Sequence, residues 1–152
     1  MLKNVVTFLA AIVIACLPGL IGRTAGQSAW YKQLDKPPLQ PPGWVFGAVW
    51  PVLYVATGVA LFLIWKSTGT HKGQALVLFA VQAILNAAWS LAFFGMDQPW
   101  LGLVIILALV VTVILCIVRF RSLSQWASWL FVPYLAWLLF ASYLNIGIIV
   151  LN

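Results

Sequence analysis

The chain of 152 residues is 64% hydrophobic and only 7% charged, with a mean hydropathy of +1.08. A soluble domain carries roughly a quarter charged residues because its surface faces water, so this composition excludes a water-soluble globular protein. The net charge of +6 does not indicate nucleic-acid binding, because positive residues that flank membrane spans account for it. Long apolar runs without alternation favour transmembrane helices over a β-barrel.

Five apolar runs are long enough to cross a bilayer, for which a helix needs about 20 mostly apolar residues. In chain order, the predicted spans are Val5–Ile21, Trp44–Trp65, Ala75–Phe94, Leu101–Phe120 and Trp129–Leu151. Lys3 before the first run resembles the start of a signal peptide, but we expect this run to be retained as the first helix. We therefore predict a single all-α transmembrane domain over residues 1–152, a bundle of five helices.

The charges between the spans predict an orientation. Five spans place the two termini on opposite faces of the membrane. The residues predicted on the N-terminal face are Lys3, Lys66, Lys72, Arg119 and Arg121; those on the other face are Arg23, Lys32, Asp35, Lys36 and Asp97. Because positive residues concentrate in cytoplasmic loops, we expect the N-terminus in the cytoplasm and the C-terminus outside.

The segment between the first and second spans is rich in proline. Pro37, Pro38, Pro41 and Pro42 restrict the backbone and remove hydrogen-bond donors, which predicts a stiff, extended path. Tryptophans on either side of this path are also typical of an interfacial belt. Together with the prolines, however, they favour a rigid lid between helices one and two, over the mouth of the bundle.

Polar and aromatic residues recur at helical spacing within three of the spans. The three predicted faces are Gln82, Asn86, Trp89 and Phe93; Pro133, Trp137, Ala141 and Asn145; and Trp50, Leu53, Tyr54 and Thr57. Facing one another, they would form an aromatic cavity suited to a large flat ligand. The alternative is that the amides join helices and the tryptophans only pack.

Metal binding and a disulfide are not expected. Cys16 and Cys116 fall at opposite depths of the membrane, too far apart to be bridged. His71 lies in a short loop without clustered ligands, so no metal site is predicted.

Three blocks of this sequence resemble the TspO/MBR family, the tryptophan-rich sensory proteins, also called translocator proteins or peripheral-type benzodiazepine receptors. Residues 30–54 match the pattern WYxxLxKPxxxPPxWVFxxVWxxLY. Residues 82–89 read QAILNAAW and are followed by FFG at 93–95, which is similar to the third helix of the family. Residues 132–137 read VPYLAW and 141–145 read ASYLN, similar to its fifth helix. The blocks occur in order over essentially the whole chain.

The resemblance implies a five-helix membrane protein of the bacterial cell membrane, often a homodimer, whose pocket binds porphyrins such as protoporphyrin IX and haem. No cofactor is required; the porphyrin is ligand or substrate, and other hydrophobic small molecules bind some members. The ligand-binding positions that it implies are Tyr31, Pro42, Trp50, Tyr54, Asn86, Trp89, Trp137, Ala141 and Asn145. Some bacterial members promote light- and oxygen-dependent porphyrin breakdown, and the catalytic tryptophans linked to it align with Trp50 and Trp137.

Two features of the sequence reduce the range of ligands that the resemblance implies. No Lys or Arg follows Tyr143, so the sterol motif of animal members is missing. The spans offer no strong axial ligand for haem iron, which favours a metal-free porphyrin. We therefore expect a porphyrin-binding receptor or sensor tied to tetrapyrrole metabolism. The alternatives are a porphyrin-degrading enzyme and a tetrapyrrole, lipid or sterol transporter.

Overall fold

The computed structural model describes residues 2–22 and 29–152, and the regular structure in these ranges is entirely helical. The helices in chain order are α1 (Leu2–Gly22), α2 (Ala29–Gln33), α3 (Gly43–Lys66), α4 (Lys72–Ser90), the short π-helix η2 (Leu91–Gly95), α5 (Pro99–Arg121), α6 (Gln125–Leu130) and α7 (Val132–Leu151). Arg23, one of the residues used to predict orientation, lies outside the described residues.

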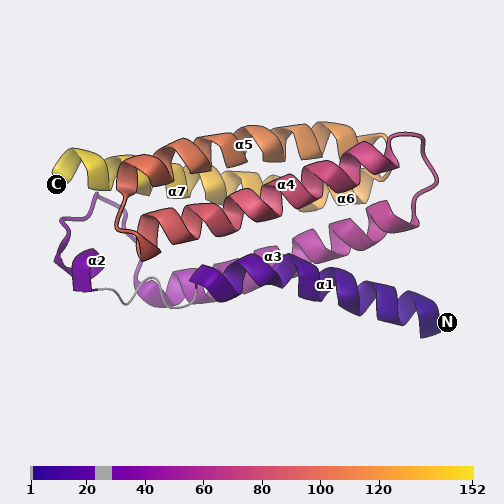
Figure 1. Ribbon diagram of the computed structural model, residues 1–152, viewed down its shortest axis with the longest axis horizontal. Helices are drawn as coiled ribbons and strands as arrows, with labels where there is room; N and C mark the ends of the chain where they lie inside the picture. The colour runs from indigo at the N-terminus through magenta and orange to yellow at the C-terminus, as the bar shows by residue number, and fades with distance from the viewer. Residues whose placement is uncertain (1, 23–28) are drawn as a thin grey trace.

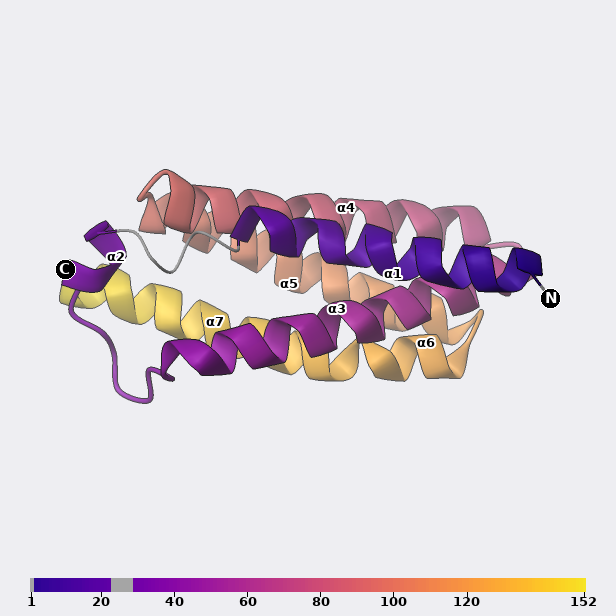
Figure 2. The ribbon, with the colours of Figure 1, turned by 90° about the horizontal axis from the view of Figure 1, so that it is seen from below.

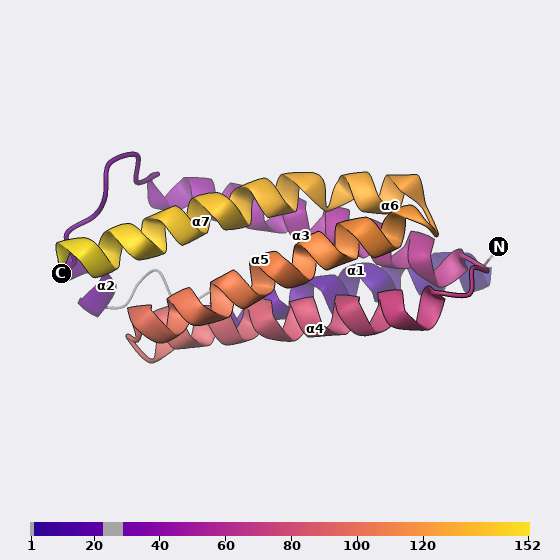
Figure 3. The ribbon, with the colours of Figure 1, turned by 90° about the horizontal axis from the view of Figure 1, so that it is seen from above.

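Five long apolar helical segments, each long enough to span a membrane, run side by side along the bundle (Figure 1). They are α1, α3, α4 with η2, α5, and α6 with α7. Around the bundle, α1 packs against α3 and α4, α4 packs against α5, α5 packs against α7, and α6 packs against both α3 and α5. Figures 2 and 3 show this arrangement from opposite sides, with α5 between α4 and α7 in Figure 3. The predicted five-helix membrane bundle is confirmed.

The two ends of the bundle differ. The N-terminus and the α3–α4 and α5–α6 connections lie at one end, which we call the N-terminal end (Figure 1). The C-terminus, α2, the proline-rich loop and η2 lie at the other end, which we call the lid end.

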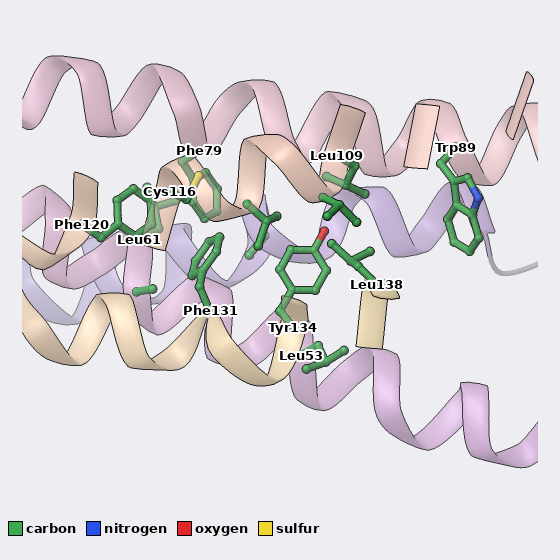
Figure 4. Packing of buried hydrophobic residues seen from close by; sticks show 14 of the residues in the cluster. Leu53, Leu61, Phe79, Trp89, Leu109, Cys116, Phe120, Phe131, Tyr134 and Leu138 are labelled. Atoms are coloured by element: carbon green, nitrogen blue, oxygen red, sulfur yellow. The ribbon is translucent and has the colours of Figure 1, made fainter. Parts of the chain in front are cut away.

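Large aromatic and aliphatic side chains fill the half of the bundle away from the lid. Phe131 sits at the centre of this core, with its ring centroid 5.0 Å from that of Phe120, 5.8 Å from Tyr134 and 6.2 Å from Phe79. In Figure 4, Trp89 stands apart from this group. Since interiors of this density resist deformation, the core provides a rigid base for the lid end.

Two of the predicted spans are interrupted where the sequence analysis expected continuous helix. The fifth span was expected to begin at Trp129, but α6 already starts at Gln125 and a separate helix, α7, follows from Val132. Ser124 caps α6 by accepting a hydrogen bond from the Ala127 amide at 3.3 Å. Pro133 has no amide hydrogen to donate to the preceding turn, which explains why a new helix begins there.

The third span ends in the π-helical turn η2. The Met96 amide donates to the Leu91 carbonyl five residues back, at 2.9 Å. Such turns are uncommon within helices and frequently occur at functional sites. Phe94 belongs to this turn, and its ring centroid lies 5.3 Å from that of Tyr31 in α2.

The lid, which we define as residues 29–42, is held against the C-terminal half of α7 by hydrogen bonds and packing. The Asn152 side chain accepts from the Asp35 amide and donates to the Asp35 carbonyl, both at 3.0 Å. Pro37 is buried against Gly147, where a Cβ atom would overlap the proline ring. The Tyr143 hydroxyl donates to the Pro38 carbonyl at 2.8 Å. Contacts across more than 100 residues of sequence therefore position the proline-rich segment.

Candidate functional site

A cavity of about 990 Å³ lies between the lid and helices α1, α3 and α4. Ligand pockets in proteins measure roughly 300–1,000 Å³, so this volume suits a large ligand. The lining residues come from α1 (Cys16, Gly19), the lid (Tyr31, Lys32, Lys36, Gln40, Pro41, Pro42), α3 (Gly43, Phe46, Gly47, Trp50, Pro51, Tyr54), α4 (Trp89, Ser90) and η2 (Phe94).

The wall formed by α3 and α4 is aromatic. Trp50 stacks on Tyr54 with centroids 5.4 Å apart and planes inclined by 25°. The Trp89 ring lies 5.9 Å from Trp50 on the α4 side. Trp50, Pro51 and Tyr54 line the cavity together because positions three and four apart share one face of a helix. This wall offers flat π surfaces, which bind flat apolar ligands by stacking.

Hydrogen bonds between three helices hold this wall in place. The Tyr54 hydroxyl donates to Asn86 Oδ1 at 3.1 Å, and Asn86 Nδ2 donates to the Tyr134 hydroxyl at 2.9 Å. The Tyr134 hydroxyl in turn donates to Gln82 Oε1 at 3.1 Å. This chain joins α3, α4 and α7. The amides of Gln82 and Asn86 thus connect helices, as the alternative interpretation of the sequence held.

Tyr31 is a lid residue whose side chain lines the cavity. Gln40 Nε2 donates to the Tyr31 hydroxyl at 3.1 Å, and both residues line the cavity. Burial raises the pKa of Tyr31 above its usual value, partly offset by the hydrogen bond from Gln40. The Tyr31 hydroxyl therefore stays protonated and uncharged at neutral pH.

Five of the nine predicted ligand-binding residues line the cavity, namely Tyr31, Pro42, Trp50, Tyr54 and Trp89. The other four are not among the described residues that line it: Asn86, Trp137, Ala141 and Asn145. Asn86 bonds to Tyr54, Asn145 accepts from Trp89 Nε1 at 3.4 Å, and the Trp137 ring meets Trp50 edge-on at 6.3 Å. Ala141 is buried on the same helix as Trp137 and Asn145.

Sequence reasoning missed the contributions of α1 and of the charged lid residues. Cys16 and Gly19 line the cavity, although α1 carried no polar or aromatic face to single it out. Lys32 and Lys36 also line the cavity, but their charges were used only to predict the orientation of the protein in the membrane. A periodic search could have found Gly47, which lies three and four residues before Trp50 and Pro51 on the same helical face.

Metal-ligating side chains do not gather around this cavity. Within residues 2–22 and 29–152 there is no cluster of three or more His, Cys, Asp or Glu side chains able to hold a metal ion. His71 precedes α4 at the N-terminal end of the bundle, away from the lid. Cys16 and Cys116 are both free thiols.

Comparison with known proteins identifies the family. The family model described as the TspO/MBR family matches residues 6–151. The "Tryptophan-rich protein TspO" of Chlorobaculum tepidum is 40% identical over 99% of this chain and 98% of its own. The "Tryptophan-rich sensory protein" of Cereibacter sphaeroides is 36% identical, with 96% and 89% covered. The human "Translocator protein" is 40% identical over 76% of this chain and 70% of its own. The chain is a multi-pass integral membrane protein that belongs to the TspO/MBR family.

Proposed function

We propose that this protein binds a metal-free porphyrin, such as protoporphyrin IX, in the cavity beneath the lid, as a receptor or sensor for tetrapyrroles. One observation carries the proposal: a cavity of about 990 Å³ with the Trp50–Tyr54 stack on its wall. A porphyrin is a large, flat, mostly apolar ring system. It gains most of its binding free energy from stacking and burial and needs few directional hydrogen bonds.

The position of the histidine favours a metal-free ligand over haem. Tight haem binding generally uses an axial ligand such as His, Met, Cys or Tyr. His71, the single histidine of the chain, lies at the opposite end of the bundle from the cavity. Tyr54, within the cavity wall, already donates its hydroxyl hydrogen to Asn86. The described residues that line the cavity therefore include no histidine, and the side chains of an axial-ligand type among them are Cys16, Tyr31 and Tyr54.

Removal of the Trp50 ring should weaken porphyrin binding. We expect Trp50→Ala to lower the affinity for protoporphyrin IX roughly tenfold, because an aromatic pair contributes about 0.5–1.5 kcal/mol beyond its buried area. The measurement is an absorbance titration of the Soret band with purified protein in a neutral detergent. Trp126→Ala is the matched control, since Trp126 is 76% exposed on α6, away from the cavity. Equal affinity of Trp50→Ala and wild type would contradict binding in this cavity.

A second candidate function is light-dependent degradation of the bound porphyrin. Trp50 lines the cavity, and Trp137 lies directly behind it with ring centroids 6.3 Å apart. An excited porphyrin with dioxygen generates reactive oxygen, and an indole beside it can donate an electron or form an adduct. In this function the pigment supplies the reactivity, and the protein positions it beside oxidisable rings.

The proposal includes an orientation in a bacterial cell membrane. Lys3, Lys66, Lys72, Arg119 and Arg121 are at the N-terminal end of the bundle. The excess of positive charge there supports a cytoplasmic N-terminus. The lid and the cavity mouth would then face the outer side of the membrane.

A further inference from the structure

The lid brings two positive charges to a cavity that is otherwise aromatic. Lys32, in the last turn of α2, and Lys36, three residues beyond the end of α2, both line the cavity. Asp35 lies between them in the chain but is not among the cavity-lining residues that the structure describes. Instead, the Asp35 backbone is engaged by Asn152, which fixes the path of the lid next to Lys36.

The ammonium group of Lys36 contacts the lid itself. Lys36 Nζ donates to the Tyr31 carbonyl at 3.1 Å and to the Leu34 carbonyl at 3.2 Å. It also lies 5.0 Å from the centroid of the Tyr31 ring, within range of a cation–π interaction. An exposed lysine normally samples many rotamers, and contacts of this kind reduce the side-chain entropy that remains to be lost when a ligand binds. An ammonium has three hydrogens, and two of them are used here, which leaves one for a further acceptor.

The polarity of the cavity is thus divided between its two sides. The lid side carries Lys32 and Lys36, whereas the α3 side carries the rings of Trp50 and Tyr54. A ligand that matches both sides is a flat apolar molecule with acidic groups along one edge. Protoporphyrin has this form, since its two propionate side chains project from the same edge of an apolar macrocycle.

We propose that Lys32 and Lys36 form an anion subsite of the cavity that binds the carboxylates of the ligand and fixes its orientation. The acidic edge lies at the lid, and the apolar edge lies against Trp50. This inference rests on the proposed porphyrin-binding function and adds that the cavity selects for carboxylates. The alternative is that both lysines only attract anionic lipid headgroups, as positive residues near a membrane surface often do.

The test compares protoporphyrin IX with its dimethyl ester, which has the same ring system but no carboxylates. Both are titrated against the full chain for the wild type and for Lys32→Met, Lys36→Met and Lys36→Arg. Each titration is carried out in nanodiscs of zwitterionic lipid and, separately, in nanodiscs that contain anionic lipid. Lys3→Met is the matched control, because Lys3 is an exposed lysine at the opposite end of the bundle.

We expect the wild type to bind the diacid more tightly than the ester. Each Lys→Met variant in the lid should weaken diacid binding roughly fivefold, as suits a charge pair at a partly exposed rim. Ester binding should not change, which shows that the lid remains in place. Lys36→Arg should retain most of the diacid affinity, and Lys3→Met should behave as the wild type.

Three results would overturn the subsite. Equal diacid affinity in the wild type and both Lys→Met variants would mean that the lysines do not contact the ligand. Equal losses for diacid and ester would assign Lys36 a purely structural role in the lid. Diacid binding that depends on these lysines only in nanodiscs containing anionic lipid would assign them to headgroups. Failure of the wild type to bind either compound would instead refute the proposed porphyrin-binding function itself.

Discussion

Replacement of Gly47 by phenylalanine should reduce protoporphyrin IX affinity by at least about tenfold while the bundle stays folded. Gly47 lies on α3 and lines the cavity, and a Cβ atom at this position would meet no other atom within 4 Å. The first atom of a phenylalanine side chain therefore fits at Gly47 without a clash. Because Gly47 lines the cavity, we expect the ring to extend into it. It would occupy space that a macrocycle needs, since a ligand cannot share volume with a side chain.

The same substitution elsewhere provides the control. Gly73, near the start of α4 at the N-terminal end, also has no atom within 4 Å of a built Cβ. Gly73→Phe should bind protoporphyrin IX as the wild type does. Both variants are measured by Soret titration, with thermal unfolding in detergent as the check on folding. A stable Gly47→Phe variant with unchanged affinity would exclude this cavity as the porphyrin site.

Replacement of both Trp50 and Trp137 by phenylalanine should slow light-driven loss of bound protoporphyrin IX to the rate measured for the free pigment. Trp50 is one of two indoles on the cavity wall, with Trp89, and Trp137 contacts Trp50 edge-on. Phenylalanine preserves an aromatic ring at both positions but is far harder to oxidise than an indole. The double variant should therefore still bind the porphyrin, which separates turnover from binding.

The rate is followed as loss of Soret absorbance under illumination, in air and under argon, at saturating protein. Trp126→Phe/Trp129→Phe is the matched control, because these tryptophans are 76% and 59% exposed on α6. We expect this control to degrade the porphyrin as the wild type does, and only in air. A wild-type rate no faster than that of the Trp50→Phe/Trp137→Phe variant would refute the degradation function and leave binding intact.

The sequence was sufficient to predict the bundle because each span is defined locally, by an apolar run of membrane-spanning length. The buried face of α4 followed from local periodicity as well. Gln82, Asn86 and Trp89 are 4%, 1% and 5% exposed, as their shared helical face predicted. Periodicity does not show which neighbouring helix each of these side chains contacts. For this reason Asn86 and Asn145 lie behind the cavity wall, hydrogen-bonded to Tyr54 and Trp89.

Local patterns also missed the features that depend on contacts distant in sequence. The prolines indicated a stiff lid, but its position depends on Gly147 and Asn152 at the end of α7. The π-helical turn η2 is defined by a hydrogen bond to the carbonyl five residues back instead of four. No particular residue type indicates such a turn in the sequence. The charge of Lys36 was used only to predict the orientation of the protein in the membrane. Its contacts with Tyr31 and Leu34, which place it at the cavity, required the folded lid.

Whether a porphyrin occupies the cavity beneath the lid can be measured directly at Cys16, a free thiol on the cavity wall. The other cysteine, Cys116, is fully buried in the core and serves as an internal control. The measurement is the rate at which a small maleimide modifies each cysteine, followed by mass spectrometry with and without saturating protoporphyrin IX. Bound porphyrin should protect Cys16, while Cys116 stays unmodified in both conditions. Equal modification of Cys16 with and without bound porphyrin would contradict binding in this cavity.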